Sequence, residues 1–172
     1  MIFVTVGTHE QQFNRLLKEI DNLKAIGIIS EDVFIQRGYS RYIPRSCRSA
    51  DFISYYDILE NIRKARIVIM HAGPSSIMDC INNGKVPIVI PRQKRYKEHI
   101  DDHQVNFCKK IESIFPVSII YDIKDLADRI ERYDLLIKDI ALRKEADSDR
   151  EERINKCVET LENICREIVA TG

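Results

Sequence analysis

The sequence has little of what marks a nucleic-acid-binding, secreted or membrane-spanning protein. Its 27 Lys and Arg residues are balanced by 27 Asp and Glu residues, so no bulk positive charge is available to attract a polyphosphate backbone. The five cysteines include no Cys-x-x-Cys pair, which disfavours a disulfide framework or a zinc finger. The chain shows no secretory signal pattern and no apolar run near the length of about 18 residues that spans a bilayer. We therefore expect a cytoplasmic protein that meets a membrane only peripherally.

Two widespread nucleotide-binding motifs are also missing. The chain has no G-x-G-x-x-G fingerprint, which disfavours a dinucleotide-dependent enzyme such as a sugar-nucleotide epimerase. It has no G-x-x-x-x-G-K-[ST] loop either, which disfavours an ordinary ATPase. A nucleotide, if one binds, must be held by a different arrangement.

Strand-like apolar segments alternate with helical ones over the first 133 residues. The strand pattern occurs at 2–6, 33–36, 66–70, 86–90 and 117–121 and more weakly at 51–54, and apolar residues take helical spacing at 10–24, 55–65, 75–83, 100–111 and 123–133. This alternation predicts an α/β fold with a Rossmann-like parallel sheet flanked by helices. We take 1–133 as this domain and 134–172 as a C-terminal helical extension.

The extension contains a regular apolar stripe. Ile154, Val158, Leu161, Cys165 and Ile168 recur at steps of four and three residues, which is the spacing of one helix face. The stripe predicts an amphipathic helix, and two roles are open to it. It either packs on its own domain or docks on a partner chain.

A strand-turn-helix segment in the middle of the chain has the most informative pattern. An apolar strand ends at His71, a turn follows with Gly73, and Ser75 and Ser76 begin a helix. A helix N-terminus in this position binds an anion through its free backbone N–H groups. Asp79 follows Ser75 by four residues and shares its helix face, at a distance suited to a ribose. His71 is either a ligand contact or a buried structural histidine.

The first strand ends in a second glycine turn, Gly7-Thr8, followed by His9 and Glu10. Gly7 permits close approach of a ligand to the backbone. Thr8 is expected to cap the next helix and to donate to a phosphate oxygen. His9 and Glu10 are candidate general bases. The alternative is that Glu10 only complements a helix dipole and His9 is simply exposed.

The segment Asp101-Asp102-His103-Gln104 adds polar groups after a later strand. Its carboxylates, imidazole and amide offer hydrogen-bond partners for sugar hydroxyls. Acids at a helix start have a dipole explanation as well. A metal site is a third possibility, although no second cluster in the sequence completes it.

Basic residues follow two strands, in loops that the sequence places at the same sheet edge. They are Arg37, Arg41, Arg45 and Arg48 in one loop and Arg92, Lys94, Arg95 and Lys97 in the other. The carboxyl edge of a parallel sheet is where ligands of open α/β folds bind. These cations can therefore face a diphosphate, an anionic bilayer or only solvent.

Four motifs occur here in the order that they have in one glycosyltransferase family. They are the opening 3–8, the His-Ala-Gly element at 71–73, the segment 84–92 and the later Asp-His-Gln at 102–104. On these motifs the chain resembles the C-terminal, donor-binding domain of family 28 glycosyltransferases, to which MurG is related. The closer resemblance is to catalytic subunits of two-chain UDP-sugar transferases, both the PssE-type exopolysaccharide and capsule enzymes and the eukaryotic dolichol-pathway UDP-N-acetylglucosamine transferase.

The resemblance implies a single half of a GT-B fold and an inverting hexosyltransferase. A UDP-sugar would be the donor, a polyprenyl-diphosphate-linked sugar the acceptor, and neither a cofactor nor a metal ion would be required. The missing half implies a membrane-associated partner subunit that places the chain at the inner face of the plasma membrane. A non-catalytic subunit that only binds the nucleotide sugar is the alternative.

The resemblance also assigns roles to residues of the donor site. Gly7 and Thr8 match the element near the diphosphate, and Gly73, Ser75 and Ser76 match the loop at the α-phosphate. His71 belongs to the same donor-binding element.

Further assignments concern the ribose, the sugar and the rim. Asp79 stands where relatives usually carry Glu at the ribose, and His103 with Gln104 falls on the pair that contacts the donor sugar. From their position in the basic loop, and not from the resemblance, Arg92 and Arg95 are predicted to lie on the rim that faces the acceptor or the membrane. His9 and Glu10 have no MurG counterpart and remain candidate bases, unless the partner supplies the base.

Overall fold

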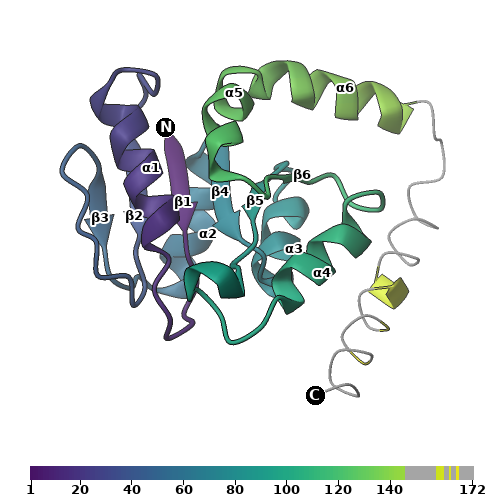
Figure 1. Ribbon diagram of the computed structural model, residues 1–172. Coiled ribbons are helices and arrows are strands. Elements are labelled where there is room, and N and C mark those ends of the chain that lie inside the picture. The colour runs from purple at the N-terminus through teal and green to yellow at the C-terminus, as the bar shows by residue number, and fades with distance from the viewer. Residues whose placement is uncertain (146–157, 161–162, 164–165, 167–172) are drawn as a thin grey trace.

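The computed structural model (Figure 1) describes residues 1–145, 158–160, 163 and 166. One parallel sheet contains β1 (Ile2–Thr5), β2 (Val33–Gln36), β3 (Arg48–Ala50), β4 (Ile67–His71), β5 (Ile88–Ile90) and β6 (Ser118–Ile119). The strand order is β3-β2-β1-β4-β5-β6. The direction of winding reverses between β1 and β4, and ligands of such sheets bind outside the carboxyl ends of the strands at this switch point.

Helices cover both faces of the sheet. They are α1 (Asn14–Ala25), α2 (Tyr55–Lys64), α3 (Pro74–Asn82), α4 (His103–Ile111), α5 (Leu126–Glu131) and α6 (Tyr133–Glu145), with short 3-10 helices η1 (Lys94–Tyr96) and η2 (Ile123–Asp125). The buried apolar residues of α1 and α5 belong to one core cluster and those of α2, α3 and α4 to another. The predicted α/β class with a parallel, Rossmann-like sheet is confirmed.

The alternation of side chains along the strands explains the two cores. Ile2 and Val4 of β1 pack in the cluster with α1, whereas Phe3, between them, packs in the cluster with α2 to α4. In β4, Val68 and Met70 join Phe3 on that second face. Because both faces are covered, the central strands are apolar at nearly every position, as parallel strands require.

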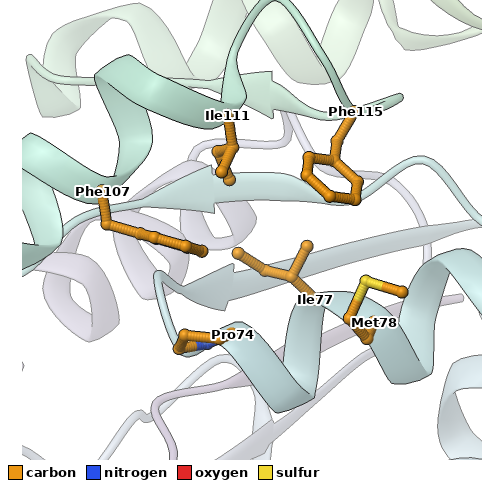
Figure 2. Close-up of a pocket in the computed structure, with 6 residues that line it drawn as sticks. All are labelled: Pro74, Ile77, Met78, Phe107, Ile111 and Phe115. Atoms are coloured by element: carbon orange, nitrogen blue, oxygen red, sulfur yellow. The ribbon is translucent and has the colours of Figure 1, made fainter. Parts of the chain in front are cut away.

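Apolar packing against α4 fixes the position of α3. Figure 2 shows a small groove between the two helices, in which Ile77 points toward Phe107 and Ile111. Pro74, at the first turn of α3, lines the same groove. The start of α3 is therefore held in place at the carboxyl edge of the sheet, beside β4.

The first helix begins later than the sequence pattern predicts. α1 starts at Asn14, with Phe13 as its N-cap, so the prediction that Thr8 caps this helix is wrong. The Phe13 N–H donates to the Ser40 hydroxyl at 2.9 Å, and the Asn14 N–H donates to the Gln12 side-chain oxygen at 2.7 Å. These bonds satisfy the helix start elsewhere and leave Thr8 exposed in a loop.

The predicted third strand also lies elsewhere. β3 is Arg48–Ala50, and the segment 51–54 is a loop that leads into α2. The reason is local, because the Ser54 hydroxyl accepts from the Asp57 N–H and caps α2. A cap at this position turns the chain away from the sheet.

The start of the C-terminal extension is anchored to the domain. Tyr133, the first residue of α6, is fully buried, and its hydroxyl donates to the Val86 carbonyl at 2.7 Å. Ile154, Leu161, Cys165 and Ile168 of the predicted stripe lie outside the described residues, and Val158 is helical and 44% exposed. Within the described part of the chain, every helix is too short or too polar to cross a bilayer.

Candidate functional site at the carboxyl edge

Two glycine turns meet at the switch point of the sheet. β1 and β4 are hydrogen-bonded parallel neighbours, so the turns that follow them lie at the same edge. A Cβ atom added to Gly7 would lie 2.4 Å from His71 Cε1, and one added to Gly73 would lie 2.4 Å from His71 Nε2. The imidazole therefore touches the backbone of both turns, and neither turn has room for a side chain there. The sequence prediction that these two turns come together is confirmed.

His71 is buried beneath the turns, with 8% of its surface exposed. Burial lowers its pKa to about 3, and the positive charge of Arg92 contributes to the shift. The ring is therefore neutral at physiological pH and carries no charge to offer a phosphate. Its position supports the interpretation of His71 as a structural residue that sets the spacing of the two turns.

The neutral state of His71 predicts a pH dependence of folding. An unfolded histidine binds a proton near pH 6.5, so the unfolded state binds more protons than the folded state between about pH 6.5 and 3. The unfolding free energy should therefore fall as the pH drops below 6.5, by up to about 1.4 kcal/mol per pH unit from this residue. Between pH 6.5 and 4.5, the unfolding free energy measured with urea should change less steeply with pH in His71→Asn than in the wild type. Equal slopes would contradict a neutral His71.

The start of α3 presents backbone donors beside these turns. Gly73 is the N-cap with extended backbone, Pro74 occupies the first helical turn, and Ser75 is exposed while Ser76 is half-buried. The first N–H groups of a helix have no partner within it and favour an anion. The predicted anion-binding element is therefore open to ligand at this edge of the sheet.

Asp79 lies on α3 and is oriented by a residue that the sequence reasoning did not include. The Tyr55 hydroxyl donates to Asp79 Oδ1 at 2.9 Å. Tyr55 is the first residue of α2, next to the Ser54 cap. The hydroxyl and the carboxylate together form a pair of hydrogen-bonding groups that suits a ribose diol. A tyrosine at a helix start carries no sequence signal for such a role.

Arg92 is buried, which corrects its assignment to the rim. Its side chain is 0% exposed, and its guanidinium donates to the carbonyl oxygens of Val6 at 2.8 Å, Gln11 at 2.7 Å, Gln12 at 3.2 Å and Glu98 at 3.2 Å. Burial lowers its pKa to about 10, against the opposing charge of Glu98, so it stays protonated at neutral pH. Arg92 thus joins the loop after β1 to the loop after β5 and does not face solvent.

Glu98 and Gln104 complete this clamp. Glu98 is fully buried and accepts two bonds from Arg15, at 2.9 and 3.0 Å, and a third from the Gln93 N–H at 3.1 Å. Gln104 is 6% exposed, and its side-chain oxygen accepts from the Arg92 N–H at 3.0 Å. This bond ties Gln104 to the loop after β5, and its assignment to the donor sugar stays a prediction.

Three histidines gather at the mouth of the site. The ring centroids of His9 and His99 are 4.4 Å apart, and those of His99 and His103 are 4.1 Å apart. His9 Nδ1 accepts from the Gln11 N–H at 3.1 Å, which leaves Nε2 for a ligand. Burial, followed by the charge of Arg92, lowers the pKa of His9. His99 thus connects His103 to His9 of the loop after β1, and His99 was not identified from the sequence.

The remaining predicted residues lie at the exposed border. Glu10 is exposed and adjoins His9, and Arg95 is exposed with its guanidinium 4.7 Å from the Tyr96 ring centroid. Of the other basic loop, Arg37 forms an ion pair with Asp51. Arg95 is thus the one of the two predicted rim arginines that does reach the surface.

Comparison with known proteins agrees with this architecture. Residues 1–161 match the glycosyltransferase family 28 C-terminal domain. Over 119 residues, 64% of the chain, the sequence is 29% identical to the UDP-N-acetylglucosamine transferase subunit ALG13 of Homo sapiens. The matched part is 10% of that protein, so the chain spans about a tenth of its length.

Two solved glycosyltransferases share the fold. SnogD from Streptomyces nogalater superimposes with a TM-score of 0.56 at 15% identity, over 99% of this chain and 43% of that one. The glycotransferase of kitacinnamycin superimposes with a TM-score of 0.53 at 16% identity, over 98% of this chain and 39% of that one. The chain thus corresponds to less than half of each, in agreement with one Rossmann-like domain of a GT-B enzyme.

Proposed function

Because the chain belongs to the glycosyltransferase family 28 C-terminal domain family, we propose that it is the UDP-sugar-binding, catalytic subunit of an inverting hexosyltransferase. The observation that carries the proposal is the meeting of the Gly7 and Gly73 turns on His71. Both turns and the start of α3 therefore lie together at the carboxyl edge of the sheet, the edge at which open α/β sheets bind phosphate-bearing ligands. The ribose is assigned to Asp79 and Tyr55, which are hydrogen-bonded to each other.

The proposed reaction uses the backbone N–H donors and the candidate bases at the carboxyl edge of the sheet. An acceptor hydroxyl attacks the anomeric carbon, the bond from that carbon to the diphosphate oxygen breaks, and UDP leaves with the electron pair. The N–H groups at the start of α3 stabilise the charge that develops on the diphosphate, and the proposed transfer uses neither a metal ion nor a cofactor. The hydroxyl proton passes to a base, which we assign to His9 Nε2 or to Glu10.

The acceptor half is assigned to another chain. The relative ALG13 is named as a subunit of a transferase, and this supports a second subunit that completes the active site. We assign to that subunit the membrane contact and the binding of a polyprenyl-diphosphate-linked sugar, as in capsule or exopolysaccharide assembly. The chain would then act in the cytoplasm, at the inner face of the plasma membrane.

Removal of the Asp79 carboxylate tests the donor site directly. Asp79→Ala should weaken UDP binding by about 1–3 kcal/mol, the usual loss for a hydrogen bond to a charged group, as measured by calorimetry on the full chain. Asp32→Ala is the matched control, because Asp32 is an exposed acid at the opposite, amino edge of the sheet, just before β2. Unchanged UDP affinity in Asp79→Ala would remove this residue from the site.

Turnover requires the second subunit. Co-expression with a membrane-associated partner, followed by incubation with a panel of UDP-sugars and a polyprenyl-diphosphate-linked sugar, should yield a product extended by one sugar. The control is a partner subunit known to be active with another catalytic chain. If this chain binds UDP beside that partner but forms no product, then it is a subunit that only holds the nucleotide sugar.

A further inference from the structure

The loop between η1 and α4 brings two imidazoles and a carboxylate together. His99, Asp101 and His103 alternate along the chain. Asp101 Oδ1 lies 3.1 Å from His99 Nδ1 and 2.5 Å from His103 Nδ1. The three donor atoms all lie within 4.8 Å of one another, and among the described residues they form a group of the kind that holds a metal ion.

The separations agree with those around a small divalent ion. Zinc binds imidazole nitrogen and carboxylate oxygen at about 2.0–2.2 Å, so the ligand atoms of a tetrahedral site lie roughly 3.3 Å apart. The contact between His99 and Asp101 already has nearly this length, and the shorter one to His103 needs only a small side-chain rotation. His99 Nδ1 also accepts from the Asp101 N–H at 3.5 Å, so this nitrogen presents a lone pair on the side of the group.

The backbone on both sides of the group is fixed. Glu98, immediately before His99, is buried and held by Arg15. Asp102 accepts from the Lys94 N–H at 2.8 Å through its side chain. Such fixed neighbours reduce the ordering cost of binding an ion, because the ligands are already in position.

Exposure leaves a path for the ion and for its remaining ligand. The His99 side chain is 7% exposed, whereas the side chains of Asp101 and His103 are 52% and 38% exposed. The ion would therefore rest against a buried imidazole on one side and meet water on the other. Burial, followed by the charge of the neighbouring His103, lowers the pKa of His99, and the Asp101 carboxylate opposes this shift.

We propose that His99, Asp101 and His103 bind one divalent transition-metal ion of the zinc class, through two Nδ1 atoms and one carboxylate oxygen. Imidazole with carboxylate suits such ions, whereas Mg²⁺ and Ca²⁺ prefer oxygen ligands alone. The proposed ion is not part of the transfer reaction, although its site shares His103 with the proposed donor site. It engages His103, so an occupied site holds this side chain away from the donor sugar.

The test uses the full chain and the ions alone. Calorimetry with Zn²⁺ and absorption with Co²⁺ should show one ion per chain, with Zn²⁺ displacing Co²⁺. Asp101→Asn and His103→Gln should each weaken Zn²⁺ binding at least about tenfold. Asp32→Asn, a change of an exposed acid at the opposite edge, should leave it unchanged. Far-UV circular dichroism checks that each variant folds.

Three results would overturn the proposal. One is wild-type affinity in Asp101→Asn or in His103→Gln, which would show that these side chains are not ligands. Another is a thiolate charge-transfer band in the Co²⁺ spectrum, which would place the ion on a cysteine such as Cys47. The last is saturation only above about 1 mM Zn²⁺, the range of non-specific contacts. None of these outcomes depends on UDP binding or turnover.

Discussion

Replacing Arg92 with methionine is expected to lower the unfolding free energy by about 3–5 kcal/mol, the usual cost of removing one partner of a buried charged network. The variant would leave four carbonyl oxygens, of Val6, Gln11, Gln12 and Glu98, without the guanidinium that now donates to them. Each buried group left unpaired costs about 1–3 kcal/mol. Urea unfolding measures the loss.

The same change should also remove UDP binding under conditions in which the variant is still folded. Arg92 holds the loop that carries Gly7, Thr8 and His9, so its loss releases one side of the proposed donor site. Arg92→Lys keeps the charge but not the planar set of donors, and it should restore only part of the stability and little of the binding.

Arg95→Met is the matched control, since Arg95 is in the same loop and exposed. Its stability should remain within about 0.5 kcal/mol of the wild type. If Arg92→Met lowered stability but left UDP affinity intact, then the loop would not depend on Arg92 for its position.

Gly7→Ala is the second change with a large expected effect. It combines a backbone cost, because Gly7 has φ of +72°, with a clash, because the new Cβ would lie 2.4 Å from the His71 ring. A left-handed conformation costs an L-residue about 1–2 kcal/mol, and overpacking adds about 1–3 kcal/mol. We therefore expect a loss of roughly 2–5 kcal/mol in unfolding free energy and a large loss of UDP affinity.

Two further glycines separate these contributions. Gly84 has φ of +73° with no atom within 4 Å of an added Cβ, so Gly84→Ala should show the backbone cost alone. Gly73 has φ of −87°, so Gly73→Ala should show the clash alone. Equal losses in Gly7→Ala and Gly84→Ala would mean that the His71 ring does not limit the space at the first turn.

A double-mutant cycle tests the contact between the turns and the imidazole. His71→Ala removes the ring that an alanine at position 73 would meet. Combined with Gly73→Ala, it should cost less than the sum of the two single changes, with a coupling of about 0.5–3 kcal/mol. Additive losses would show that the ring and the turn are independent.

Two errors of the sequence-based predictions involve contacts between residues far apart along the chain. The helix pattern at 10–24 continues smoothly from Glu10, yet α1 starts at Asn14 because Phe13 and Asn14 have their N–H groups satisfied by Ser40 and Gln12. The basic character of Arg92 suggested a position on the solvated rim. Its guanidinium instead donates to carbonyl oxygens of residues that precede it by 80, 81 and 86 positions. Periodicity reports local patterns and is silent about pairings across such separations.

His99 and Tyr55 were also missed. His99 gains its significance only from the loop conformation that brings it to Asp101 and His103. Tyr55 reaches Asp79 from another helix, 24 positions earlier in the chain. Neither residue stands in a motif, so neither carries a signal until the chain is folded.

The sequence alone determined the α/β class, the succession of strands and helices, and the two glycine turns that end β1 and β4. These depend on hydrophobic periodicity and on the special backbone freedom of glycine, which act over a few residues. The tertiary structure alone decided that the turns share one imidazole, that Arg92 is buried against the loop after β1, and that His9 lies beside His99. These facts follow from the order of parallel strands, which sets neighbours that are far apart along the chain.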